Sequence, residues 1–397
     1  MGRLSVMNWR TKILNPKPFA RTDFRSLSTP IYRGSTVIFD GYESVTDHWE
    51  HSKEGYSYGL YGTPTTLELA ERISHMENSY HTFIVPGGQA AIALVYLSFC
   101  KSGSHVLVPV SAYGPNKEMG AGLLANFDVE LEEYDPTIGR NIHQLIRKNT
   151  SLIWCESPGS VTMEVQDVPA IVFEAKKREV PVALDNTYAS GVFFDAFSHG
   201  LDISIQALTK YIGGHSDLLL GSVSVKDEIG YRIVGNIFKQ LGLAVSPDDC
   251  SLALRGLQTL GIRLDALEES TLKVAGWLEQ NSATCELYHP AFKSCPGHHI
   301  WKRDFSGSAS VFSILFNNEI TQDQVGTFLN ALEIFKLGLS WGGVTSLAVS
   351  YPDLMRPNAD FSGRLVRFNI GLEDPDDLIN DLCKAMTAAS IRISASV

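Results

Sequence analysis

The sequence predicts an α/β protein in which a mainly parallel β-sheet is flanked by helices. Short apolar segments typical of buried strands alternate with helical segments, and turn residues stand at the junctions. Neighbouring parallel strands need a long crossover, usually a helix, and such a sheet is buried on both faces. The chain has 397 residues, of which 44% are hydrophobic, so it is long enough to cover a sheet on both sides.

Three regions follow one another along the chain. Residues 1–65 are interrupted by prolines and glycines and predict an irregular N-terminal arm, which we expect to lie across another subunit because it cannot bury itself. Residues 66–260 predict the main α/β domain, which would bind a ligand at the sheet edge. Residues 261–397 predict a smaller α+β C-terminal domain.

The individual elements follow from apolar periodicity. In the main domain we expect strands at 81–85, 104–110, 129–134, 151–155, 180–185, 204–208 and 218–225, and helices at 66–78, 90–103 and 168–179. In the smaller domain we expect a helix at 261–280 and strands at 310–316 and 365–372, with two helical segments between these strands.

Charge and composition exclude several kinds of partner. The formal net charge of −11 argues against nucleic acid or an anionic membrane, because both need a basic surface. No signal-peptide pattern opens the chain and no apolar run reaches the roughly 18 residues of a membrane span, so we expect a cytoplasmic protein. The six cysteines form no C-x-x-C pair and no His/Cys cluster, so we predict reduced thiols and no metal site.

Polar residues follow the carboxyl ends of the predicted strands, where open parallel sheets bind ligands. These residues are Gly88 and Gln89 at a helix entry, Tyr113, Asp185, and Thr209 with Lys210. Each has a simpler explanation: a Gly-Gly pair often marks a tight turn, a lone tyrosine is usually packing, and Asp185 and Lys210 could form an ion pair. Buried charged groups nevertheless need partners, and one ligand can satisfy them all.

Pyridoxal phosphate (PLP) is that ligand. Its phosphate needs the backbone amides at 88–89 and a hydroxyl such as that of Thr209. Its ring needs a stacking face, which Tyr113 offers, and its pyridine nitrogen needs the carboxylate of Asp185 to stay protonated. Its aldehyde needs an amine of lowered pKa, and a desolvated Lys210 supplies one.

The sequence also resembles the fold-type I, PLP-dependent enzymes of cysteine and methionine metabolism, nearly end to end. The resemblance rests on TPIYRGSTVIFD, YGLYGTPTTLELAERI, ESPGSVTMEVQDVPAI, LDNTYASGVFFDAFSHGLDISIQALTKYIGGHSD, SWGGVTSL and VRFNIGLEDPDDLI. It implies a PLP transferase-like fold. It also implies that Lys210 holds the cofactor as a Schiff base and moves a proton, while Tyr113 stacks on the ring and helps to deprotonate the incoming amine.

The same resemblance implies the remaining roles. Arg367 binds the substrate carboxylate in a two-pronged ion pair, and Ser340 and Trp341 line the substrate pocket. Asp185 pairs with the pyridinium, and the phosphate is held from within the subunit by Gly88, Gln89 and Thr209. Tyr58 reaches that phosphate from a neighbouring subunit, which implies a homotetramer with shared sites.

The implied reaction is the α,β-elimination of L-cystathionine, a sulfur-containing amino acid, to homocysteine, pyruvate and ammonia. Glu156-Ser157-Pro158-Gly159 continues without the Asn-Pro of many γ-specific members, and Trp341 also favours the β-lyase branch. The same residues suit γ-elimination, γ-replacement or a specialised biosynthetic C–S lyase, so these reactions stay open. A non-catalytic regulatory protein of the same fold is the remaining alternative.

Three positions depart from the family pattern. Leu60 stands where the family usually has an arginine that reaches the phosphate, Ala207 replaces a serine, and Thr345 stands where many members have a larger polar residue. The missing arginine removes a charge-assisted contact worth about 1.5–3 kcal/mol. These departures leave Lys210 and Asp185 in place and bear on substrate identity and phosphate affinity.

Overall fold

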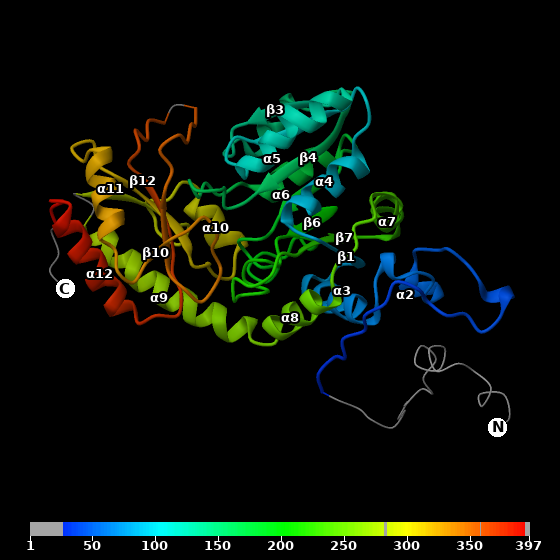
Figure 1. Cartoon of the computed structure of the whole chain (residues 1–397). Coiled ribbons are helices and arrows are strands. Elements are labelled where there is room, and N and C mark those ends of the chain that lie inside the picture. The colour runs from blue at the N-terminus through cyan, green and yellow to red at the C-terminus, as the bar shows by residue number, and fades with distance from the viewer. Residues whose placement is uncertain (1–26, 282–283, 358, 394–397) are drawn as a thin grey trace, which may run out of the picture. The chain divides into compact units, whose positions relative to one another are not determined.

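The computed structural model describes residues 27–281, 284–357 and 359–393 (Figure 1). The chain divides into two units, residues 1–30 and residues 31–397, and all elements described below belong to the second. The first 26 residues of the predicted arm lie outside the described residues. No helix in the described part is long and apolar enough to cross a membrane.

The main sheet has seven strands in the order β1-β7-β6-β5-β4-β2-β3. They are β1 (His81–Val85), β2 (His105–Pro109), β3 (Glu130–Tyr134), β4 (Thr150–Glu156), β5 (Val182–Asp185), β6 (Ile203–Gln206) and β7 (Gly221–Val225). The five strands from β6 to β3 pair in parallel, so the predicted mainly parallel sheet is confirmed. Strand β7 runs antiparallel to β1 and β6, because the connection 207–220 contains no helix that would carry the chain back.

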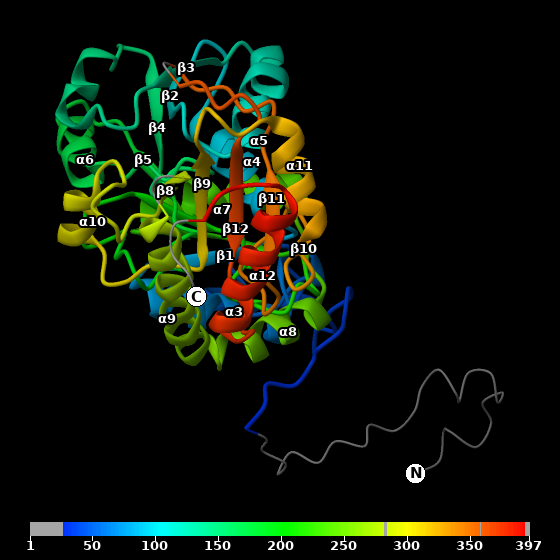
Figure 2. The same ribbon diagram turned by 90° about the vertical axis from the view of Figure 1, so that its left-hand side faces the viewer.

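Helices cover both faces of this sheet (Figures 1 and 2). The long helices are α3 (Pro64–Glu77), α4 (Gly88–Phe99), α6 (Val168–Lys176), α7 (Glu228–Leu241) and α8 (Pro247–Leu257). One apolar cluster joins alternate strand residues to α4 and α7, and two others join the remaining strand residues to α3, α6 and α8. Shorter helical turns are η2 (Tyr42–Ser44), α2 (His51–Glu54), η3 (Gly59–Tyr61), α5 (Gly114–Met119), η4 (Gly120–Leu124), η5 (Ala125–Phe127) and η6 (Gly139–Gln144).

The second sheet has five strands in the order β10-β11-β12-β9-β8. They are β8 (Cys285–Tyr288), β9 (Val311–Phe316), β10 (Lys336–Leu337), β11 (Leu347–Ser350) and β12 (Leu365–Asn369). Helices α9 (Leu260–Gln280), α11 (Gln322–Ala331) and α12 (Pro375–Ala388) share its core, and α10 (His298–Asp304) precedes β9. Of the two helices expected between the strands now seen as β9 and β12, only α11 lies there in the described part of the chain; α12 follows β12, so the expected order is wrong for one helix. The predicted domain limits at 65/66 and 260/261 stay predictions.

The described part of the arm differs from our expectation. The Trp49 ring lies 4.9 Å from the Tyr231 ring and 6.0 Å from the Phe83 ring, and His51 and Tyr61 are buried. The expectation that the arm cannot bury itself is therefore wrong for the stretch around Trp49, His51 and Tyr61, which packs on β1 and α7 of the same chain, whereas none of residues 27–48 is buried.

One histidine of the smaller sheet's core makes stability depend on pH. The His289 ring contacts Phe292 and Phe312, and its Nδ1 accepts a hydrogen bond from the Ala291 backbone N–H at 3.1 Å. Burial lowers the pKa of His289 to about 3. The native state therefore holds this ring uncharged, whereas an exposed histidine titrates near 6.5.

We expect acid to weaken the native state through His289. Its contribution is fully present above about pH 6.5 and is lost as the pH falls towards 3, by about 2 kcal/mol at pH 5. The measurement is the urea midpoint at pH 7 and pH 5 for wild type and His289→Asn, which can still accept from Ala291 but does not titrate. The variant should lose less on acidification; an equal loss in both proteins contradicts the assignment.

Candidate active site

The predicted lysine lies in the connection between β6 and β7, beside the smaller sheet. Lys210 Nζ donates to Ser340 Oγ at 2.8 Å and lies 5.3 Å from the centre of the Trp341 ring. Desolvation and the positive charge of Arg367 lower the pKa of Lys210 to about 8, and the charge of Asp185 opposes this shift. The amine is therefore a much better nucleophile and base near neutral pH than an exposed lysine.

Arg367 comes to the same place from the middle of β12. It is 7% exposed, its guanidinium carbon lies 5.2 Å from the centre of the Tyr351 ring, and it donates to the Leu339 carbonyl and, at 3.4 Å, to that of Ser340. Within the described ranges no acidic side chain forms an ion pair with it. A buried cation without a counter-ion suits a carboxylate ligand.

Asp185 ends β5 at the edge of the main sheet. Its Oδ1 accepts from the Thr187 backbone N–H at 3.0 Å and from the Thr187 hydroxyl at 2.6 Å. Burial raises its pKa, while the Thr187 hydrogen bonds and the charge of Lys210 oppose the rise. No cation pairs directly with Asp185 in the described part of the chain, so the simple Asp185–Lys210 ion pair is absent there. A protonated pyridine nitrogen fits such a carboxylate.

Two of the predicted phosphate residues, Gly88 and Gln89, are the first two residues of α4. An ideal Cβ at Gly88 would lie 2.8 Å from the Ala207 Cβ, so the Gly88 backbone approaches the lysine connection closely. The Gln89 side chain donates to the Pro115 carbonyl at 3.0 Å, and the N–H groups of the first helical turn have no partner inside the helix. Thr209 Oγ1 already donates to the Leu220 carbonyl at 3.1 Å, so its predicted phosphate contact needs a rearrangement.

Tyr113 follows β2, and its backbone is held by Glu156, a residue that the sequence analysis did not place in the site. Its backbone N–H donates to Glu156 Oε2 at 2.8 Å, and Glu156 pairs with Asp185 across β4 and β5. Burial and the neighbouring charge of Asp185 raise the pKa of Glu156 well above its usual range. Burial and the charge of Glu156 also raise the pKa of Tyr113. The predicted roles of Tyr113 in ring stacking and in deprotonation of the incoming amine stay predictions. The strand-end rule that found Asp185 would also have found Glu156.

The structure does not bring Tyr58 to the other predicted residues. It is 45% exposed, forms a bridge with Thr36 and lies with its ring 6.4 Å from that of Tyr61. Leu60, which we expect to stand where the family has an arginine, lies with its Cδ1 3.7 Å from an ideal Cβ at Gly242, at the end of α7. A surface cavity of about 890 Å³ formed by α3 and residues 51–56 and 78–81 contains none of the predicted site residues.

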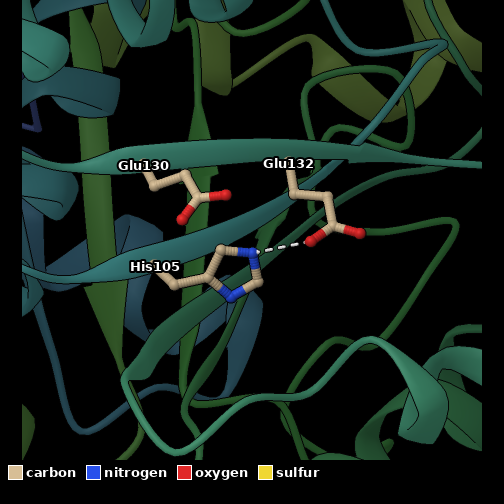
Figure 3. A group of neighbouring side chains, drawn as sticks. All are labelled: His105, Glu130 and Glu132. Atoms are coloured by element: carbon tan, nitrogen blue, oxygen red, sulfur yellow. Dashed lines mark hydrogen bonds and ion pairs between the residues drawn. The ribbon is translucent and has the colours of Figure 1, made fainter.

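One group within the described residues has the composition of a metal site (Figure 3). The ligand atoms of His105, Glu130 and Glu132 lie within 4.8 Å of one another. However, Arg147 donates to Glu130 at 2.8 Å and pairs with Glu132, and the two ring nitrogens of His105 contact Glu132 at 3.1 Å and Thr150 at 2.9 Å. An arginine already neutralises these carboxylates, so we propose no metal here.

The residues around Lys210 fit PLP. An amine of lowered pKa, a partly buried carboxylate and a buried guanidinium lie at the junction of the two sheets, and neither of the last two has a counter-ion among the described residues. The backbone at Gly88 is close to the connection that carries Lys210, and the N–H groups at the start of α4 could bind the phosphate. This arrangement can hold an amino acid by its carboxylate and move a proton at its Cα.

Comparisons with known proteins agree with this fit. Residues 10–387 match the model of the Cys/Met metabolism PLP-dependent enzyme family. The chain is 41% identical to a putative cystathionine beta-lyase of Rhizobium johnstonii, over 97% of this chain and 96% of that protein. It is 37% identical to cystathionine beta-lyase MetC of Escherichia coli, over 94% of this chain and 96% of the relative.

A solved structure shows the same fold. The cystathionine gamma synthase of Xanthomonas oryzae pv. oryzae, in complex with cystathionine, superimposes with a TM-score of 0.84 at 29% identity, over 92% of this chain and 94% of that one. The predicted PLP transferase-like fold and the predicted cofactor are thereby confirmed. From the family match over most of its length and the relatives above, the chain belongs to the Cys/Met metabolism family of PLP-dependent enzymes.

Proposed function

We propose that this enzyme catalyses the α,β-elimination of L-cystathionine in the cytoplasm, which consumes one water molecule and gives homocysteine, pyruvate and ammonia. The observation that carries the proposal is the position of Lys210 Nζ, 2.8 Å from Ser340 Oγ and close enough to Arg367 for the guanidinium to lower its pKa. A substrate carboxylate on Arg367 would bring its Cα within reach of the lysine. The names of the relatives at 37–41% identity support cystathionine as the substrate.

In this proposal the residues of the chain bind, orient and move protons. Arg367 binds the α-carboxylate, and Asp185 and Tyr113 hold the cofactor ring. When bound, PLP withdraws electrons from the substrate Cα. Lys210 Nζ takes the Cα proton and returns it to the departing sulfur, while Ser340 Oγ orients the amine between these transfers.

The competing reactions of the family need one further step. γ-Elimination and γ-replacement require a second proton to be removed, at Cβ, and Lys210 could serve for both. A cystathionine gamma synthase has the same fold as this chain, so fold alone does not separate the reactions. The direct test is incubation of the purified PLP-loaded enzyme with L-cystathionine. Homocysteine and pyruvate support β-elimination, whereas cysteine and 2-oxobutyrate indicate γ-elimination and overturn the proposal.

We expect the amine of Lys210 to react with acetic anhydride in the PLP-free protein with a midpoint near pH 8, whereas a typical lysine has a midpoint near 10.4. Arg367→Gln should move that midpoint upward, because it removes a neighbouring positive charge. Mass spectrometry of the acetylated peptide follows both proteins. A midpoint for Lys210 near 10 in the wild type shows that the amine is not desolvated.

We also propose a homotetramer in which subunits share sites, as the sequence predicted. Several large apolar side chains of residues 31–58 are exposed: Ile31, Tyr32, Ile38, Tyr42, Val45 and Tyr58. A second copy of the chain would cover such side chains. Tyr58 lies apart from Lys210 within its own subunit, which suits a role in a neighbouring site.

Subunit mixing tests the sharing. Tyr58→Ala and Lys210→Ala should each have little activity, the first because phosphate binding is weakened. After dissociation and reassembly of a mixture, about a quarter of the sites would combine an intact lysine with an intact tyrosine from the partner. Activity should therefore return towards a quarter of wild type. No recovery, in a sample shown to contain mixed oligomers, contradicts a shared site, and a monomer with full activity does so directly.

Leu60→Arg should tighten PLP binding by up to about tenfold if the residue faces a neighbour's phosphate, a gain of about 1.4 kcal/mol. The matched control Leu60→Met keeps the size and lacks the charge, so its affinity should equal that of wild type. Titration of PLP-free protein measures both. Unchanged PLP affinity with altered substrate preference would mean that Leu60 shapes the substrate pocket. If neither property changes, Leu60 does not occupy the arginine position.

A further inference from the structure

A polar layer is buried between α3 and the main sheet, on the face away from α4 and α7. Ser204 of β6 and Ser224 of β7 pair directly across the two strands, and Thr82 of β1 donates to or accepts from Ser224 at 2.8 Å. All three side chains are fully or almost fully buried. Apolar residues would make a more stable layer here, because buried polar groups cost free energy unless each is paired.

Glu77, the last residue of α3, is the centre of this layer. Its side chain accepts from the Ser204 hydroxyl at 2.7 Å and from the Ser224 hydroxyl at 2.5 Å, and the residue is only 4% exposed. Burial raises its pKa. A carboxyl group in the last turn of a helix is also disfavoured by the helix dipole. Glu77 therefore occupies this position against both local preferences, which is typical of functional residues.

The layer continues to the two turns that carry the proposed catalytic groups. An ideal Cβ at Gly191 would lie 2.9 Å from Glu77 Oε1 and 2.6 Å from Gln206 Nε2, so both side chains lie against the same backbone. The side chain of Asn186 also influences the pKa of Glu77. Gln206 is the last residue of β6, directly before the turn that carries Lys210.

The other turn follows β5. Asn186 directly follows Asp185, and its backbone N–H donates to the Ile205 carbonyl at 2.9 Å, which joins the ends of β5 and β6. Thr187 strengthens the connection, because its hydroxyl donates to Asp185 and accepts from the Ala207 backbone N–H at 2.9 Å. Hydrogen bonds thus join the turn after Asp185 directly to the turn before Lys210. Glu77 lies against both turns on the face of the sheet that α3 covers.

We propose that Glu77 is a positioning residue that fixes the distance between Asp185 and Lys210, because it holds the ends of β5 and β6 from the α3 face of the sheet. Glu77 touches neither the cofactor nor the substrate in this account. Removal of its side chain takes one hydrogen bond from each of Ser204 and Ser224 and leaves an empty space beside Gly191 and Gln206. The distance between Asp185, which binds the pyridine nitrogen of PLP, and Lys210, which binds its aldehyde carbon, would then be less well defined.

The inference rests on the proposed roles of Asp185 and Lys210. Its test measures PLP binding, which does not depend on cystathionine being the substrate. Glu77→Ala should weaken PLP binding at least tenfold and change the visible absorption spectrum of the bound cofactor. Glu77→Gln, which has the same shape and can bond both serines, should restore both properties to within about twofold of wild type. Should Glu77→Ala fail to fold, Ser204→Ala removes one hydrogen bond to Glu77, and Ser224→Ala removes one to Glu77 and one to Thr82. Each variant should weaken PLP binding severalfold.

A control separates positioning from general stability. Asp381 is another buried carboxylate, which accepts from the backbone N–H groups of Glu333, Ile334 and Phe335 beside the smaller sheet. Asp381→Asn should lower the melting temperature and leave PLP affinity and spectrum as in wild type. If Glu77→Ala or both serine variants lower the melting temperature like this control without a change in affinity or spectrum, Glu77 only stabilises the fold and the proposal is wrong.

Discussion

The active site depends on the removal of water from charged groups at the junction of the two sheets. Arg367 is buried and Lys210 and Asp185 are partly buried, and in the described part of the chain none of the three forms a direct ion pair. Desolvation disfavours each charge, which lowers the pKa of the lysine to about 8 and raises that of the aspartate. This arrangement costs stability in the free chain, and a cofactor and a substrate with the matching charges would offset that cost.

The fold supplies the rigidity that such a site needs. Lys210 belongs to the main sheet's last connection, whereas Arg367 and Ser340 come from the smaller sheet. The two parts are joined next to the lysine, because the Tyr211 hydroxyl accepts from the Ser310 backbone N–H at 2.9 Å and lies 3.0 Å from the Ser310 hydroxyl. A substrate carboxylate and the amine that acts on its Cα would therefore be held by separate elements that cannot move independently.

Much of this arrangement could be predicted from the sequence, because buried strands and the polar residues at their ends leave a clear pattern. The direction of β7 could not, since an apolar strand has the same pattern in either direction and only the short connection 207–220 decides. Glu77 was also hidden, because a glutamate in a helix usually faces solvent, and its burial depends on serines far away in sequence. The position of Tyr58 relative to a partner's site rests on an assembly that one chain does not contain.

The departures noted in the sequence gain a physical meaning from the structure. Ala207 lies with its Cβ against Gly88, so a serine there would place a hydroxyl beside the helix entry where the phosphate is expected. The side chains of Leu60 and Ala207 offer no hydrogen-bond donor. Phosphate binding should then depend more strongly on the backbone N–H groups at the start of α4.

The assignment of Lys210 as the amine that binds PLP is the central claim, and one measurement tests it directly. Borohydride reduction of the PLP-loaded wild-type enzyme fixes the cofactor to the amine that binds it, and peptide mass spectrometry then locates the label. Labelling of the peptide that contains Lys210, at close to one cofactor per chain, is the expected result. A label on any other lysine, or no label on a protein that contains bound PLP, contradicts the account.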